Sequence, residues 1–297
     1  MTKFRVGSHL GMAYNLSKTP AYAKSLGYNI FQIFLGVPQR LLSKSRSENE
    51  LTALANELKK NSMKMVVHGS YTINLSQPEQ SALFKTSIKA LVQDLNAVSI
   101  IGKRCLGVII HMGKNIPTNN ITTEQALNNY IKGLKQALSQ SPKNTIIILE
   151  TGSSQGNEVG SKIDGLKTIY NGLNQTEQSR VMFCIDTCHI WVTGYDISTP
   201  AGVKKFFEEF NNKIGINRIA CIHFNDSKIV LGGKVDRHAD IGYGFIGETG
   251  LRAIARFGQT NKIPLITETP LDSVNLKTNQ DIDAQYELEK MQSWLNE

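Results

Sequence analysis

The chain has 297 residues, of which 40% are hydrophobic and 20% charged, so it is large enough to bury a sizeable core. It contains no run of about 18 apolar residues that could cross a membrane and no long apolar segment behind its N-terminal charges. We therefore expect a soluble, intracellular protein. The excess of 33 Lys and Arg over 25 Asp and Glu gives a net charge of +8, which favours a polyanionic partner without identifying one.

Four cysteines, Cys105, Cys184, Cys188 and Cys221, lie in or beside apolar runs, and none belongs to a CxxC pair. This pattern is typical of buried, reduced thiols. A zinc finger through Cys184, Cys188 and His189 would need a second cysteine pair, which the chain lacks.

Eight runs rich in apolar and β-branched residues predict β-strands. They are continuous hydrophobic stretches rather than alternating ones, which is typical of strands covered on both faces and therefore of a parallel sheet. In chain order, the runs are residues 5–10, 29–34, 65–69, 106–113, 145–151, 181–187, 219–226 and 265–269.

Helix-start signals lie between these runs. Thr19 with Pro20, and Thr199 with Pro200, each offer an N-cap followed by a proline at the first helical position. Gly27 is expected to end the first of these helices.

Two capping boxes are predicted, one from Ser47 with Glu50 and one from Thr122 with Gln125. The tail, residues 281–297, is expected to form a last helix on the outside. Strand and helix signals alternate eight times, and no linker or low-complexity tract divides them. We predict an α/β fold, a (β/α)8 TIM barrel formed by residues 1–297 as a single domain.

Six of the predicted strands end in a side chain that can bind a metal ion. These side chains are His68, His111, Glu150, Asp186, His223 and Glu268. Because the carboxyl ends of the strands of a parallel barrel open on one face, the six should converge there. Three further candidates, His189, Asp236 and His238, follow strands and would close over the same mouth.

The chemistry of these nine side chains predicts a metal centre. Imidazole and carboxylate without thiolate suit zinc in an open, catalytic site, with manganese or iron as alternatives. Nine ligands are too many for one or two tetrahedral ions, but three ions with bridging carboxylates would use them all. Three dications and four carboxylates leave a net positive charge, which would attract a phosphodiester. His9, at the end of the first strand, is expected to line the pocket rather than bind a metal.

At these residues the chain resembles the endonuclease IV family of apurinic/apyrimidinic (AP) endonucleases. The matching motifs include GSH at 7–9, HGSY at 68–71, CIDTCH at 184–189, VDRH at 235–238 and ET at 268–269. They extend over nearly the whole chain. The motif ETG at 150–152 departs from the family, which often has Asn after the Glu, and we expect this change to be tolerated.

The resemblance implies three zinc ions and a role for each candidate ligand. His68, His111 and Glu150 would hold one ion; Asp186, His223 and Glu268, with Glu150 bridging, a second; and His189, Asp236 and His238 the third. It also implies a reaction in base excision repair, hydrolysis of the phosphodiester 5′ to an abasic site by water activated near Glu150 and Glu268. The products would be a 3′-hydroxyl and a 5′-deoxyribose phosphate, and trimming of blocked 3′ ends would use the same chemistry.

The resemblance further implies double-stranded DNA as partner, bent by loops that turn the abasic nucleotide into the pocket. Tyr71 matches one loop residue of the family. The next position, usually bulky and apolar, is Thr72, and the expected loop arginine aligns with Gln39, beside which Arg40 could substitute. Arg237, between two candidate ligands, could contact a DNA phosphate.

Two other functions are compatible with such a barrel. A sugar isomerase or epimerase needs only one or two metals, and the third ligand group argues against it. A catalytically silent DNA-binding protein would tolerate the loss of a ligand, and the complete set argues against that. The sequence leaves open a cellular or viral origin, and hence cytoplasm, nucleus or virion, as well as the preferred 3′ ends. We expect a monomer.

Overall fold

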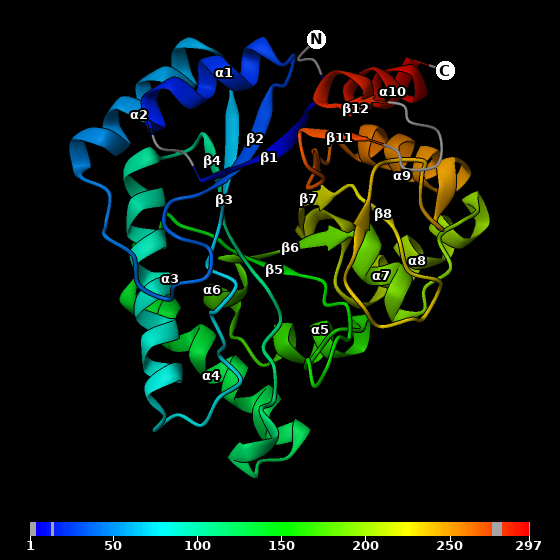
Figure 1. The fold of residues 1–297 in the computed structure, drawn as a ribbon. Coiled ribbons are helices and arrows are strands. Elements are labelled where there is room, and N and C mark those ends of the chain that lie inside the picture. The colour runs from blue at the N-terminus through cyan, green and yellow to red at the C-terminus, as the bar shows by residue number, and fades with distance from the viewer. Residues whose placement is uncertain (1–3, 13–14, 275–280, 297) are drawn as a thin grey trace.

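The computed structural model describes residues 4–12, 15–274 and 281–296. Eight parallel strands close into a barrel in the order β1-β10-β7-β6-β5-β4-β3-β2, and helices surround it (Figure 1). The predicted (β/α)8 TIM barrel is therefore confirmed.

The barrel strands match the eight predicted runs to within three residues at either end. They are β1 (Val6–Met12), β2 (Ile30–Phe34), β3 (Lys64–His68), β4 (Cys105–Ile110), β5 (Ile147–Glu150), β6 (Val181–Asp186), β7 (Ile219–His223) and β10 (Leu265–Thr267). Short strands β8 (Asp226–Ser227) and β9 (His238–Ala239) form one hairpin, and β11 (Asp272–Val274) pairs with β12 (Asp281–Asp283).

The helices of the described residues follow the strands. They are α1 (Thr19–Ser25), α2 (Glu48–Lys60), α3 (Ala82–Ile101), α4 (Thr123–Gln140), α5 (Ile163–Asn171), α6 (Gln175–Gln178), α7 (Thr187–Thr193), α8 (Pro200–Lys213), α9 (Gly247–Asn261) and α10 (Ala284–Asn296). Short 3-10 helices occupy Leu16–Lys18, Pro117–Asn119 and Ile216–Arg218. Within the described residues, none of the helices is both long and apolar enough to cross a membrane.

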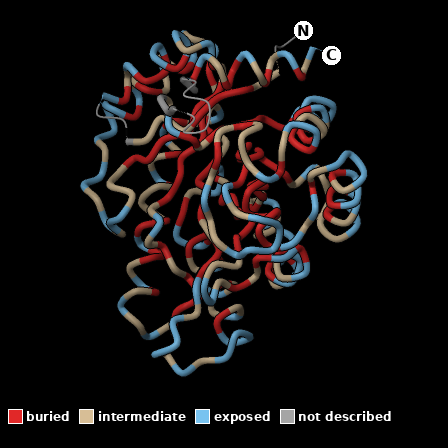
Figure 2. The backbone as a smooth tube through the Cα atoms, turned by 45° about the vertical axis from the view of Figure 1, so that its right-hand side comes forward, coloured by how far each residue is buried: buried red, intermediate tan, exposed pale blue. Residues whose placement is uncertain are grey.

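Two hydrophobic layers explain why the strands are apolar on both faces. A small cluster that includes Ile30, Val66, Ile109 and Ile148 fills the barrel interior, and a larger cluster lies between strands and helices. Buried residues accordingly follow the strands and the inner sides of the helices (Figure 2). The four cysteines are buried free thiols, as predicted.

Most of the predicted helix starts are confirmed. Ser47 and Thr122 form their capping boxes, and Thr199 caps α8 by accepting a hydrogen bond from the amide of Gly202. Gly27 has φ +84°, which glycine adopts most easily, and it follows the end of α1.

Three expectations were wrong in detail. Thr19 is the first residue of α1 rather than its N-cap, because its hydroxyl donates to the carbonyl of Asn15 within the preceding 3-10 turn. The last helix begins at Ala284, because residues 281–283 pair with β11; residue 297 lies outside the described residues. The run 219–226 is divided, since β7 ends at His223 and Asp226 belongs to the β8–β9 hairpin.

Candidate metal centre

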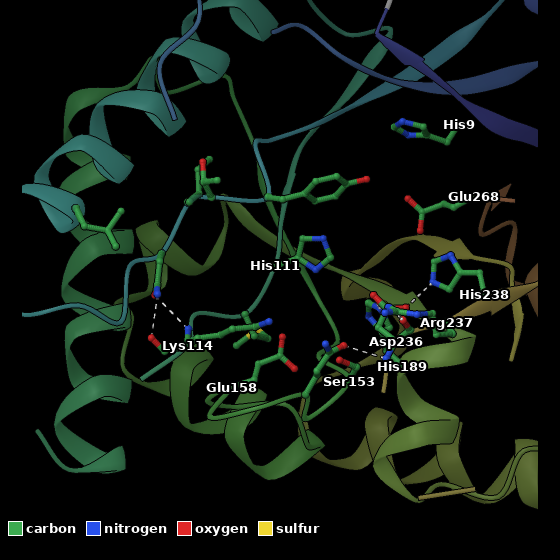
Figure 3. Close-up of a pocket in the computed structure, with 17 residues that line it drawn as sticks. His9, His111, Lys114, Ser153, Glu158, His189, Asp236, Arg237, His238 and Glu268 are labelled. Carbon is green, nitrogen blue, oxygen red and sulfur yellow. Dashed lines mark hydrogen bonds and ion pairs between the residues drawn. The ribbon is translucent and has the colours of Figure 1, made fainter. Parts of the chain in front are cut away.

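The carboxyl ends of the barrel strands open into a pocket of about 810 Å³. Figure 3 shows His189, Asp236 and His238 on one side of it and Lys114 and Glu158 on the other. The pocket therefore lies where the parallel topology directs the strand-end side chains.

The nine candidate ligands gather into three groups, two of which share Glu150. Within each group, the nitrogen and oxygen atoms lie within 4.8 Å of one another. The groups are His68, His111 and Glu150; Glu150, Asp186, His223 and Glu268; and His189, Asp236 and His238. They contain the same residues as the three sets that the sequence analysis assigned to three ions.

Glu150 lies where the first two groups meet. Its Oε2 is 3.4 Å from both His68 Nε2 and His111 Nδ1, and its Oε1 is 2.9 Å from His223 Nδ1. The other group is linked by Asp236, whose two oxygens lie 3.0 Å from His189 Nε2 and 3.2 Å from His238 Nε2. The carboxyl ends of four strands, helix α7 and one hairpin supply these atoms.

Hydrogen bonds to main-chain carbonyls fix the orientation of two of the imidazoles. His68 Nδ1 is 2.7 Å from the carbonyl of Gly69, and His189 Nδ1 is 2.7 Å from that of Thr151. A carbonyl only accepts, so Nδ1 must carry the proton in both rings. In the neutral rings Nε2 then presents a lone pair to a carboxylate of Glu150 or Asp236, and a metal cation between the two acceptors would bind both.

Buried polar atoms without hydrogen bonds support the same conclusion. Glu150 Oε2, His189 Nε2 and His238 Nε2 are buried and make no hydrogen bond of good geometry with the described residues. A buried polar atom without a partner is costly, and metal coordination is one way to satisfy it. The donor set therefore fits divalent metal ions.

Burial and neighbouring charges shift the pKa values of several ligands of the centre. Burial alone would raise the pKa of Glu150, but His111 and His223 hold it well below its usual range. Burial lowers the pKa of the His111 imidazole to about 4, so the ring is neutral at physiological pH and keeps the lone pair that a metal needs. Burial raises the pKa of Asp186, and a bound cation would offset that penalty.

Three polar residues that support the ligands had no role in our sequence analysis. Gln32 Nε2 donates to Glu268 Oε1 at 2.7 Å, and Gln32 Oε1 accepts from His223 Nε2 at 2.8 Å. Asn225 Nδ2 donates to Asp186 Oδ2 at 2.8 Å, and Thr151 Oγ1 accepts from the amide of Asp186 at 2.9 Å. Gln32 could have been detected, because it is the one polar residue of the strand IFQIF.

His9 lines the pocket, as expected, and takes no part in the three groups. Its Nδ1 lies 2.7 Å from Gln32 Nε2. Cys188 was expected to be only a buried thiol, yet its Sγ lies within 4.8 Å of ligand atoms of Asp186 and His238. It is also 3.7 Å from the carbonyl of Arg237.

The candidate DNA-contact residues lie around the pocket. Tyr71 is 51% exposed, and its ring centroid is 5.4 Å from that of His68 and 5.6 Å from that of His111. Thr72 and Arg237 also line the pocket.

Gln39 and Arg40 are exposed on the neighbouring loop. That loop is held to the Tyr71 loop by the carbonyl of Pro38, which accepts from the amide of Tyr71 at 3.0 Å and from the Ser70 hydroxyl at 2.7 Å. Of the five candidates, Tyr71, Thr72 and Arg237 line the pocket, and Gln39 and Arg40 lie on the loop beside it.

Comparisons with known proteins agree with the barrel fold. A family model described as a xylose isomerase-like TIM barrel matches residues 20–296. The chain is 60% identical over 291 residues to a putative endonuclease 4 of Acanthamoeba polyphaga mimivirus, covering 98% of this chain and 93% of that protein. It is 33% identical over 271 residues to a probable endonuclease 4 of Nitrosopumilus maritimus, covering 90% and 94%.

A solved structure is similar as well. Endonuclease IV from Thermus thermophilus superposes with a TM-score of 0.81 and 24% identity, covering 98% of this chain and 99% of that one. At this identity the likeness bears on the fold, and it extends over the whole barrel that carries the pocket.

Proposed function

Because the chain belongs to the endonuclease IV family, a family of metal-dependent nucleases, we propose that it incises double-stranded DNA at abasic sites. The observation that carries the proposal is the convergence of nine imidazole and carboxylate side chains into three groups at the mouth of the barrel. Three dications held by these ligands would supply the positive charge that stabilises a phosphodiester during hydrolysis.

Zinc is the metal that this donor set fits best, and manganese or iron could replace it at one site. The three groups would hold one ion each, with Glu150 shared between two of them. When bound, such ions polarise a phosphodiester and make water a better nucleophile.

Glu150 and Glu268 have the catalytic roles in this proposal. His223 and His238 hold the pKa of Glu268 well below its usual range although burial alone would raise it, so the carboxylate is ionised at neutral pH. An ionised carboxylate accepts hydrogen bonds, and the two glutamates can therefore orient an attacking water on the 5′ side of the abasic nucleotide. The products would be a 3′-hydroxyl and a 5′-deoxyribose phosphate, and the same chemistry would trim blocked 3′ ends.

Residues at the rim would hold the bent DNA. Tyr71 and Thr72 line the pocket, and in this proposal their side chains fill the space left by the missing base. Arg237, Arg40 and Gln39 are exposed and could contact phosphates or base edges. We further propose that the protein acts as a monomer in the interior of a cell or in a virion.

The test is incubation with a duplex that carries one synthetic abasic site, with products sized on a denaturing gel and metals measured in parallel. We expect incision 5′ to the site without added magnesium, lost after prolonged chelation that removes three zinc ions per chain. The same duplex with an intact base is the control. An uncut abasic duplex, together with turnover of a ketose by protein that holds one metal, would establish the sugar isomerase alternative instead.

A further inference from the structure

Basic residues cluster at the pole of the barrel opposite the pocket. The eight segments that lead into the barrel strands are residues 4–5, 26–29, 61–63, 102–104, 141–146, 179–180, 214–218 and 262–264. They contain seven Lys or Arg and no Asp or Glu, and β3 itself begins with Lys64. The carboxylates of the metal centre are all at the other ends of the strands, so charge is divided between the two poles.

Three of these cations lie together, and we name Arg5, Lys64 and Arg104 the basal cluster. They precede or begin β1, β3 and β4, which with β2 form four adjacent strands of the barrel. Each donates to one main-chain carbonyl: Arg5 to Asn29 at 2.8 Å, Arg104 to Met63 at 3.1 Å and Lys64 to Lys103. These bonds fix the three partly exposed side chains at the amino ends of neighbouring strands.

No carboxylate among residues 4–12, 15–274 and 281–296 forms an ion pair with any member of the basal cluster. Burial, and then repulsion by Arg104, lowers the pKa of Arg5. Burial, and then repulsion by Arg5 and Arg104, lowers the pKa of Lys64. The fold therefore keeps three partly buried cations close together although their mutual repulsion is unfavourable.

Helix dipoles account for only part of this charge. The helices point their C-termini to this pole, where cations such as Lys59 and Lys60 in the last turn of α2 are stabilising. Other basic residues have structural partners: Arg180 donates to the carbonyls of Leu138, Pro142 and Thr145. The members of the basal cluster also donate to main-chain carbonyls, but each makes one such bond, so both guanidinium groups keep further donors available to an anion.

We propose that the basal cluster binds the phosphate backbone of a second DNA duplex. Two guanidinium groups and an ammonium group are positively charged donors that suit phosphate oxygens. Lys64 and His68 are the first and last residues of β3, so the two surfaces are roughly 13 Å apart along one strand and face opposite ways. One molecule can thus bridge two duplexes, one at each pole.

The test uses the full-length protein and two undamaged duplexes, one with a donor and one with an acceptor fluorophore. Wild-type protein should bring the duplexes together, and R5Q/K64Q/R104Q should reduce the energy transfer at least about tenfold. Loss of three phosphate contacts should also make the binding of DNA less sensitive to salt: the slope of log K for DNA binding against log salt concentration should decrease in magnitude by about 2.7. The matched control K89Q/K135Q/K167Q removes three exposed lysines from α3, α4 and α5 and should bridge as wild type.

Three further measurements keep the outcome unambiguous. R5K/R104K preserves charge and should retain bridging, which separates charge from folding. Light scattering without DNA should show a monomer, because a dimer could also bridge through its two pockets. Single-turnover incision by R5Q/K64Q/R104Q should stay within about twofold of wild type. If wild-type protein does not incise abasic DNA, the proposed function fails, while the energy transfer between the two duplexes still tests bridging.

Bridging by R5Q/K64Q/R104Q at the wild-type level would overturn the proposal, as would an equal loss in K89Q/K135Q/K167Q. If poly-glutamate inhibited bridging as strongly as competitor DNA of the same total charge, the assignment of the basal cluster to phosphate would be wrong.

Discussion

Gln32 ties together two side chains of the candidate metal centre that lie on different strands. Because its Oε1 accepts from His223 Nε2, the Nδ1 of that imidazole is left to face Glu150 and Glu268. The Nε2 of Gln32 at the same time donates to one oxygen of Glu268 and fixes its position. A side chain that orients ligands in this way typically contributes about 10- to 100-fold to metal affinity.

We therefore predict that Gln32→Leu lowers the affinity of the centre for zinc about 10- to 100-fold. Competition with a fluorescent zinc chelator measures the affinity, and Gln140→Leu, at an exposed position of α4, is the control. Unchanged affinity in Gln32→Leu would show that the ligands hold their positions without it.

Glu268 provides the sharpest test of the catalytic assignment. Glu268→Gln removes a metal-binding carboxylate while keeping its size, so we expect incision of abasic DNA to fall by orders of magnitude and DNA binding to stay largely intact. Single-turnover kinetics and a binding titration measure the two effects. Glu289→Gln, at an exposed position of α10, should leave both unchanged, and a wild-type rate in Glu268→Gln would remove Glu268 from the mechanism.

At the scale of elements, α10 is fastened to the barrel by a buried carboxyl group. Glu287 is 3% exposed; its Oε1 accepts from the amide of Ile241 at 3.2 Å, and its Oε2 accepts from the Thr269 hydroxyl at 2.8 Å. Both partners belong to segments that carry ligands, since Thr269 follows Glu268 and Ile241 follows the strand of His238. Helix α10 thereby helps to hold the ligand group that contains His238 and the one that contains Glu268.

This contact predicts a dependence of stability on pH. Burial raises the pKa of Glu287 from 4.5 to about 7 in the folded protein. The favourable contribution of Glu287 to the free energy of unfolding is therefore complete below pH 4.5. It is lost as the pH rises through 7, at up to about 1.4 kcal/mol per pKa unit. Glu287→Gln cannot ionise, and its amide can still accept from Ile241 and donate to Thr269.

We expect the free energy of unfolding of Glu287→Gln, relative to wild type, to increase between pH 5 and pH 8. Urea unfolding at the two pH values measures it, and Glu289→Gln should show no such change. Parallel pH profiles for wild type and Glu287→Gln would mean that Glu287 stays ionised in the folded chain.

For the molecule as a whole, the sequence predicted the barrel because each strand is a continuous hydrophobic run, and it predicted which side chains converge because parallel strands share one direction. The β8–β9 hairpin could not be predicted, since strands of two residues have no periodicity. The contact of Glu287 with Ile241, 46 residues apart, depends on how the last helix packs. That the whole chain is a single domain remains a prediction.

The metal centre should also stabilise the whole barrel, because its ligands come from β3, β4, β5, β6, β7 and the segments after β8 and β10. Metals that bind only the folded state add about 4 kcal/mol each when present at 1,000 times their Kd. At roughly 2 to 4 °C per kcal/mol, we expect removal of three ions to lower Tm by more than about 10 °C. Calorimetry before and after exhaustive chelation measures this shift.

Return of zinc should restore Tm, and the shift should be smaller in Glu268→Gln, which lacks one ligand from the start. An unchanged Tm after verified loss of metal would mean that hydrogen bonds among the ligands alone hold the mouth of the barrel together.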